Sequence, residues 1–70
     1  MQYFFNIITD TQEIRDPEGS ALASEELAQD EAVALVQELR TEFPGRFGHG
    51  SVLEVVNDQG RRVMALPIPA

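Results

Sequence analysis

The sequence contains no cysteine, so neither a disulfide nor a thiolate-held zinc ion supplements its hydrophobic core. It contains no lysine either, and five arginines stand against twelve acidic residues, which gives a net charge of -7. This surplus of negative charge disfavours binding to nucleic acid and to anionic membranes. Residues 1–70 make a single domain, and so short a chain buries only about 60% of its unfolded surface. We therefore expect self-association to supplement its stability.

Long hydrophobic runs are also absent. The apolar stretch over residues 3–8 is too short for a signal peptide or a membrane span, and no basic region precedes it. We therefore expect a cytoplasmic protein that has no membrane partner. The hydrophobic fraction of 43%, together with clear periodicity, nevertheless predicts a folded domain and not a disordered tail.

The longest periodic segment spans residues 24–43 and predicts a helix. At about 100° per residue, its apolar side chains fall on one stripe and its polar side chains lie opposite. Ser24 is placed to cap the first turn, and Pro44-Gly45 ends the helix. The stripe that we expect to face a sheet consists of Ala28, Ala32, Leu35, Val36, Leu39 and Phe43.

Four segments carry strand patterns, arranged as two hairpins. Residues 3–9 and 13–15 predict the first hairpin, and a proline turn over residues 16–19 follows it. Residues 51–56 and 61–66 predict the second hairpin. Its loop over residues 57–60 ends in Gly60, which suits a left-handed conformation, and we expect Pro67 and Pro69 to end the pairing.

The predicted fold class is therefore α+β, in two layers. The order β-β-α-β-β gives a four-stranded, mainly antiparallel sheet with one helix packed on one face. The order of the strands within the sheet stays open, because the first strand satisfies the same periodicities beside the third strand or beside the fourth.

One helix covers only one face of such a sheet, so the composition of the opposite face is informative. Alternation along the strands directs Tyr3, Phe5, Ile7, Leu53 and Val55 toward the helix. The opposite, outer face is then largely apolar, and contiguous apolar surface of this kind usually marks an interface. The interface candidates are Phe4, Asn6, Ile8, Glu54 and Val56, with Val52 beside them and Met64 and Leu66 from the fourth strand.

An alternative is that Phe47 and the proline-containing tail fold over the outer face and cover it. A charged residue in place of Phe4 or Val56 would then change neither the fold nor the mass in solution. The sequence leaves both arrangements open.

The sequence offers weak candidates for chemistry. An acidic stretch made of Asp10, Glu13, Asp16 and Glu18 does not match a calcium loop and is explained by its turn. His49 has no recognisable orienting partner, and the glycines around it do not match a phosphate-binding loop. We therefore predict no metal site, no cofactor and no enzymatic activity, and an enzyme built on His49 is only the third hypothesis.

The arginines also fail to form a predicted nucleic-acid site. Arg40 and Arg46 lie near the start of the third strand, whereas Arg61 and Arg62 lie at its far end. No aromatic platform for stacking bases accompanies either pair. We therefore expect no nucleic-acid partner.

Several motifs resemble a group of small bacterial proteins that carry a domain of unknown function. The similar stretches are Tyr3-Phe4-Phe5-Asn6-Ile7, Asp16-x-Glu18-Gly19, the alanine-rich helix and the hairpin Asn57-Asp58-x-Gly60. Those proteins typically open with Tyr-Phe-Phe-His, and this sequence has Asn6 at the position of the histidine. The resemblance implies a ββαββ-like fold and a bacterial cytoplasmic protein, and it implies no activity.

Two functional hypotheses follow. The first is a non-catalytic protein-interaction or regulatory module that forms a homodimer. The alternative is an antitoxin-like inhibitor, similar in fold to small antitoxin domains, that holds a basic protein partner through Glu13, Asp16 and Glu18.

Overall fold

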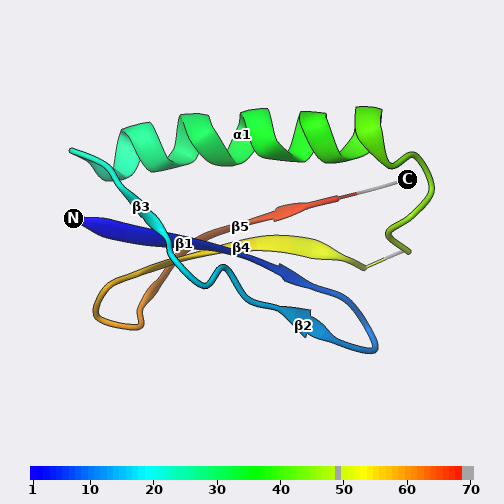
Figure 1. Cartoon of the computed structure of the whole chain (residues 1–70), viewed down its shortest axis with the longest axis horizontal. Coiled ribbons are helices and arrows are strands. Elements are labelled where there is room, and N and C mark those ends of the chain that lie inside the picture. Colours follow the sequence, from blue (N-terminus) through cyan, green and yellow to red (C-terminus); the bar gives the residue numbers. More distant parts are fainter. Residues whose placement is uncertain (49, 69–70) are drawn as a thin grey trace.

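A computed structural model describes residues 1–48 and 50–68 of the chain (Figure 1). One helix, α1 (Glu25–Glu42), lies along one side of an antiparallel sheet. The predicted α+β class with a helix between two pairs of strands is confirmed. The strands are β1 (Gln2–Ile8), β2 (Glu13–Ile14), β3 (Ser20–Ala21), β4 (Val52–Asn57) and β5 (Arg62–Pro67).

The sheet has the order β2-β1-β4-β5, and the short strand β3 also pairs with β1. The first strand therefore lies beside β4, which resolves the order that the sequence left open. Strand β3 is a fifth strand that the sequence analysis missed. It consists of two residues, with Ser20 opposite Tyr3, and so short a strand has no periodicity of its own.

Helix α1 begins and ends where the sequence predicts. The Ser24 hydroxyl accepts a hydrogen bond of 3.2 Å from the Leu27 N–H, and acidic residues occupy the first turn. At the other end, the Phe43 N–H donates to the Leu39 carbonyl at 3.0 Å before the Pro44-Gly45 turn.

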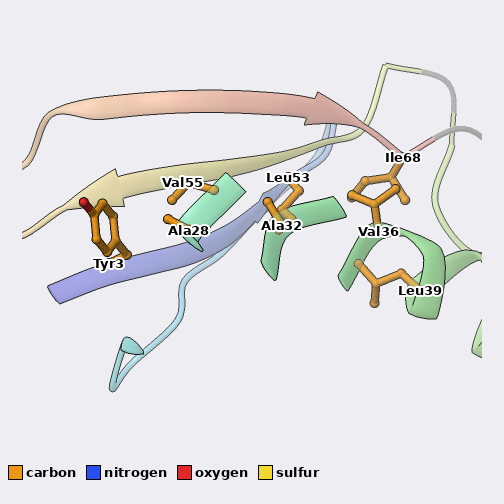
Figure 2. Close-up of a cluster of buried hydrophobic side chains, with 8 residues drawn as sticks. All are labelled: Tyr3, Ala28, Ala32, Val36, Leu39, Leu53, Val55 and Ile68. Atoms are coloured by element: carbon orange, nitrogen blue, oxygen red, sulfur yellow. The ribbon is translucent and has the colours of Figure 1, made fainter. Parts of the chain in front are cut away.

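The hydrophobic core lies between α1 and the sheet (Figure 2). Ala28 and Ala32 are fully buried, and their short side chains let the first half of the helix approach the sheet closely. The fully buried Leu53 and Val55 of β4 lie on the same side of the sheet as α1. The remaining buried apolar residues of this core are Tyr3, Val36, Leu39 and Ile68.

The second hairpin shows how β5 tolerates proline. Pro67 was predicted to end the pairing, but it lies within β5, opposite Val52. The Ile68 N–H donates to the Ser51 carbonyl at 2.9 Å, so the neighbouring pair Val52 and Pro67 is not hydrogen-bonded. The proline nitrogen therefore points to the open edge of the sheet, where a missing N–H breaks no bond.

Candidate interaction surfaces

The five predicted interface residues lie together on the face of the sheet that α1 does not cover. Phe4 is opposite Val56, Asn6 is opposite Glu54, and Ile8 is opposite Val52. Directly opposite residues of an antiparallel pair share one face, so these six side chains form one block, called here the outer face. The four apolar members are half-buried within the single chain.

Two further predictions for this face are wrong. Met64 and Leu66 are opposite Val55 and Leu53, so they point to the helix side and pack against the core. A register shift between Val55 and Val56 changes which residues of β5 face outward. Arg62, Ala65 and Pro67 occupy the outer positions instead.

The predicted cover of the outer face is also absent from the described residues. Phe47 packs against the core cluster, and Ile68 is buried in it, both on the helix side of the sheet. These residues close the end of the core near Leu39 and do not cover the outer face. Pro69, the second proline of the predicted tail, lies outside the described residues.

A polar network occupies the centre of the outer face. Asn6 is only 3% exposed, and its Oδ1 accepts a hydrogen bond of 2.9 Å from the Asp16 N–H. The Asn6 Nδ2 lies 3.5 Å from Glu54 Oε1, and the Arg62 Nε donates to Glu54 Oε2 at 3.0 Å. Each buried polar atom of Asn6 therefore has a partner, and Glu54 is paired with Arg62. The carboxyl groups of Asp16 and Asp58 line the hollow beside this network.

Asp16 attaches the loop between β2 and β3 to the edge of β1. Its Oδ2 accepts from the Phe5 N–H at 3.2 Å, while Oδ1 accepts from the N–H groups of Gly19 at 3.1 Å and Glu18 at 3.3 Å. Burial raises the pKa of the Asp16 carboxyl, but the three backbone hydrogen bonds together outweigh it and lower the pKa below 3.8. The ionised carboxylate is therefore the form that this loop stabilises.

Gly19 completes the same loop at a position where no larger residue fits. Its φ is +73°, and a Cβ atom there would lie 2.8 Å from the Phe4 ring and 2.9 Å from the Tyr3 carbonyl oxygen. The loop therefore packs directly against an outer-face side chain, which helps to hold the Phe4 ring in place.

A second surface lies on the helix side of the sheet, and the sequence analysis missed it. Helix α1 packs on β4 and β5, whereas the hairpin of β1 and β2 extends away from it (Figure 1). Two hollows of about 390 and 300 Å³ adjoin between α1 and this hairpin, and both are lined by Ile7 and Ile14. We call this the helix-side groove, and its main apolar residues are Phe5, Ile7, Ile14, Leu35, Leu39 and Phe43.

Two residues of the groove are unusually exposed. Phe43 was predicted to lie in the buried stripe of the helix, but it is 46% exposed. Phe43 follows the last helical residue, and its ring lies outside the core. The centroid of this ring is 5.6 Å from the Arg46 guanidinium carbon. Ile14 lies in β2, opposite Ile7 of β1, and is 43% exposed. The pairing of two isoleucines across the first hairpin was the one signal in the sequence for this surface.

The negative charge is concentrated on α1. The helix carries six acidic residues and one arginine, a net charge of -5, and the other residues carry six acidic residues and four arginines, a net charge of -2. Among the described residues, the ion pairs are Arg15 with Glu13 and Arg62 with Glu54. None of the acidic residues of α1 takes part in them.

A family model described as a domain of unknown function, DUF6894, matches residues 2–69. The chain belongs to the DUF6894 family. This membership confirms that the chain carries an uncharacterised domain, and the match covers the elements that form the outer face and the helix-side groove. No curated protein and no solved structure matches this DUF6894 chain at a significant level.

The other predicted sites of the DUF6894 chain are placed as follows. Asp16 is bound to backbone N–H groups and Glu13 is paired with Arg15 at 2.8 Å. In the described ranges, no three histidine, cysteine, aspartate or glutamate residues gather as a metal site would require. The third hypothesis rests on His49, which lies outside the described residues. Over the same ranges, no helix has the length and apolar character needed to cross a membrane.

Proposed function

We propose that this chain is a non-catalytic protein-interaction module that forms a homodimer by packing the outer faces of two sheets. The observation that carries the proposal is a set of apolar side chains on the face that α1 does not cover, in two clusters on either side of the polar pair Asn6 and Glu54. Phe4, Ile8, Val52 and Val56 supply the apolar surface, and the pair formed by Glu54 and Arg62 is neutral. Apolar side chains that lie together on one exposed sheet face favour association over exposure to water.

A second copy is a suitable occupant of the outer face for two reasons. A twofold axis brings the same patch of each copy together, and two sheets then pack face to face about 10 Å apart. A stable interface buries about 800 Å² per partner, which is about one sixth of the 4722 Å² accessible surface of this chain. The ion pair of Glu54 with Arg62 reduces the repulsion between two acidic chains that approach through this face, although their helices repel each other.

The test is the absolute mass in solution, measured by size exclusion with light scattering over a wide range of concentration. We expect a mass of about twice 7.8 kDa that is the same at low and high salt. Phe4→Glu places two carboxylates in the apolar interface, so we expect the mass to fall to that of one protomer. Val56→Glu, from the opposite strand, has the same expected result.

The matched control is Val33→Glu, which adds the same charge at an exposed position of α1. It leaves the mass of the dimer unchanged, and amide spectra of all variants establish that the fold is intact. A wild-type chain that is monomeric over the whole range, or a folded Phe4→Glu variant that stays dimeric, contradicts the proposal.

A second candidate function is the binding and inhibition of a basic protein, as an antitoxin does. The charge of -5 on α1 favours it. The structure changes the residues concerned, because Glu13 is paired with Arg15 and the Asp16 carboxylate is bound by three N–H groups. The free carboxylates of α1 are then the basis of this candidate, and it predicts binding that weakens strongly with salt.

Both candidates fit a regulatory or accessory protein of the bacterial cytoplasm, as the resemblance of the sequence to small bacterial proteins implies. Neither requires a cofactor, a metal ion, nucleic acid or a membrane. Fractionation of a cell that expresses the full chain tests the location, and recovery in the membrane fraction contradicts it.

A further inference from the structure

Part of the helix side of the sheet, beside the hairpin of β1 and β2, is incompletely covered. A helix is about 10 Å wide and strands lie about 4.8 Å apart, so one helix covers about two strands. Helix α1 packs on β4 and β5. Tyr3 of β1 is buried in the core, whereas Phe5 and Ile7 are only partly buried and Ile14 of β2 is exposed, and these three side chains line the hollows beside α1.

The helix-side groove, which these side chains line, has the dimensions of a second helix. The groove follows α1 from Glu31 to Phe43, which corresponds to roughly 18 Å of helix at 1.5 Å per residue. An amphipathic helix of about 12 residues placed there would complete a layer of two helices on the sheet. Its apolar stripe would contact Ile7, Ile14 and Phe43.

The charges beside the groove indicate the chemistry of this helix. Glu31 lines the groove, and Glu38 and Glu42 fall within about 20° of it on the helical wheel, on the same flank of α1. These three carboxylates have no ion-pair partner among the described residues. Arg15, which is paired with Glu13, and Arg46, which stacks on Phe43, are the cations beside the groove.

We propose that the helix-side groove binds a basic amphipathic helix of a different protein, whose lysine or arginine side chains pair with Glu31, Glu38 and Glu42. The helix of a second copy carries the same charge of -5 and would be repelled. This inference rests on the second candidate function, since it names the binding site and the class of partner for that function. The inference is independent of self-association through the outer face.

The experiment uses the full chain and a designed peptide of about 15 residues, in which leucine and lysine follow helical spacing. Titration into the labelled protein is followed by amide chemical shifts. We expect shift changes at Ile7, Ile14 and Phe43 and not at Phe4 or Val56. A peptide of the same composition, scrambled to remove the helical spacing, binds more weakly.

Two double variants with the same change of net charge separate the groove from general charge attraction. Glu31→Gln with Glu38→Gln removes carboxylates beside the groove, and we expect binding to weaken roughly fivefold. Glu26→Gln with Asp30→Asn removes two carboxylates elsewhere on α1, and we expect a change below about twofold. All four positions are exposed, so the fold is retained.

Each other outcome overturns a distinct claim. Equal weakening in both double variants overturns the groove and leaves the second candidate function in place. A wild-type chain that does not bind the peptide overturns both. An Ile14→Glu variant that dissociates a dimer makes a second copy the occupant of the groove and overturns the proposed partner.

Discussion

The outer face and the helix-side groove are both apolar, but their polar groups are arranged in opposite ways. On the outer face the polar groups lie at the centre, and Asn6, Glu54 and Arg62 satisfy one another there. In the groove the floor is apolar, and the carboxylates of Glu31 and its neighbours stand unpaired at the side. Polar groups that satisfy one another suit an identical copy, whereas unpaired carboxylates along one side of a groove favour a partner of the opposite charge.

The two surfaces also differ in how firmly the chain holds them. Asp16 fixes the loop between β2 and β3 with three backbone hydrogen bonds, and Gly19 of this loop packs on Phe4 of the outer face. The groove is formed by Ile14 of a two-residue strand and by Phe43 just beyond the end of α1, and both are exposed. The difference indicates a preformed surface on one side of the sheet and an incomplete layer on the other.

Removal of the Asp16 carboxylate has the largest expected effect on the free energy of unfolding, and it tests how firmly the outer face is held. Asp16→Ala leaves three N–H groups without their charged acceptor, so we expect the free energy of unfolding to fall by about 2–4 kcal/mol. The matched groove variant Ile14→Ala, at a 43% exposed position, costs less than about 1 kcal/mol. Denaturant unfolding measures both. Equal losses of unfolding free energy in the two variants would show that the chain stabilises the two surfaces to the same extent.

Substitution of alanine for Gly19 or for Gly60 gives the next largest expected loss of stability. Both glycines have positive φ, +73° and +80°, so alanine at either position costs about 1 kcal/mol in backbone strain. Only at Gly19 does the new Cβ also meet Phe4 and the Tyr3 carbonyl, and we expect a total of about 2–3 kcal/mol there.

The mass in solution extends this test to the surfaces. We expect Gly19→Ala to displace the Phe4 ring and to weaken the proposed dimer, and we expect Gly60→Ala to leave its mass unchanged. A dimer that is indifferent to Gly19→Ala would separate the packing of this loop from the interface.

The dependence of stability on pH gives the smallest effect. The pKa of Asp16 is lower in the folded chain than its ordinary value of 3.8. Its contribution is therefore fully present above that value and is lost as the pH falls through the folded pKa. We expect the stability difference between the wild type and Asp16→Asn to be constant near neutral pH and to shrink below about pH 4. A difference that does not vary with pH would mean that ionisation of Asp16 does not support the loop.

The sequence predicted those parts of the fold that repeat along the chain. The stripe from Ala28 to Leu39 and the alternation from Tyr3 to Ile8 are strong periodic signals, and both elements formed as expected. The same alternation placed Phe4 and its partners of β4 on one face, because the two strands pair without a register shift.

The features that were missed depend on contacts between distant residues. A single register shift after Val55 moved Met64 and Leu66 to the helix side, and no local pattern reveals such a shift. The Phe5 N–H donates to the Asp16 carboxylate and the Asp16 N–H donates to Asn6 Oδ1, and both bonds join segments ten or more residues apart. The groove exists because α1 lies over β4 and β5, which periodicity alone does not specify.

Pro67 has a consequence for the size of any assembly. Strand β5 ends the strand order on one side, and a free sheet edge invites further chains to add strand after strand. The nitrogen of Pro67 faces that edge and offers no donor, so a continuous ladder cannot extend past the end of β5. Addition of a further strand at this edge is therefore disfavoured at the end of β5.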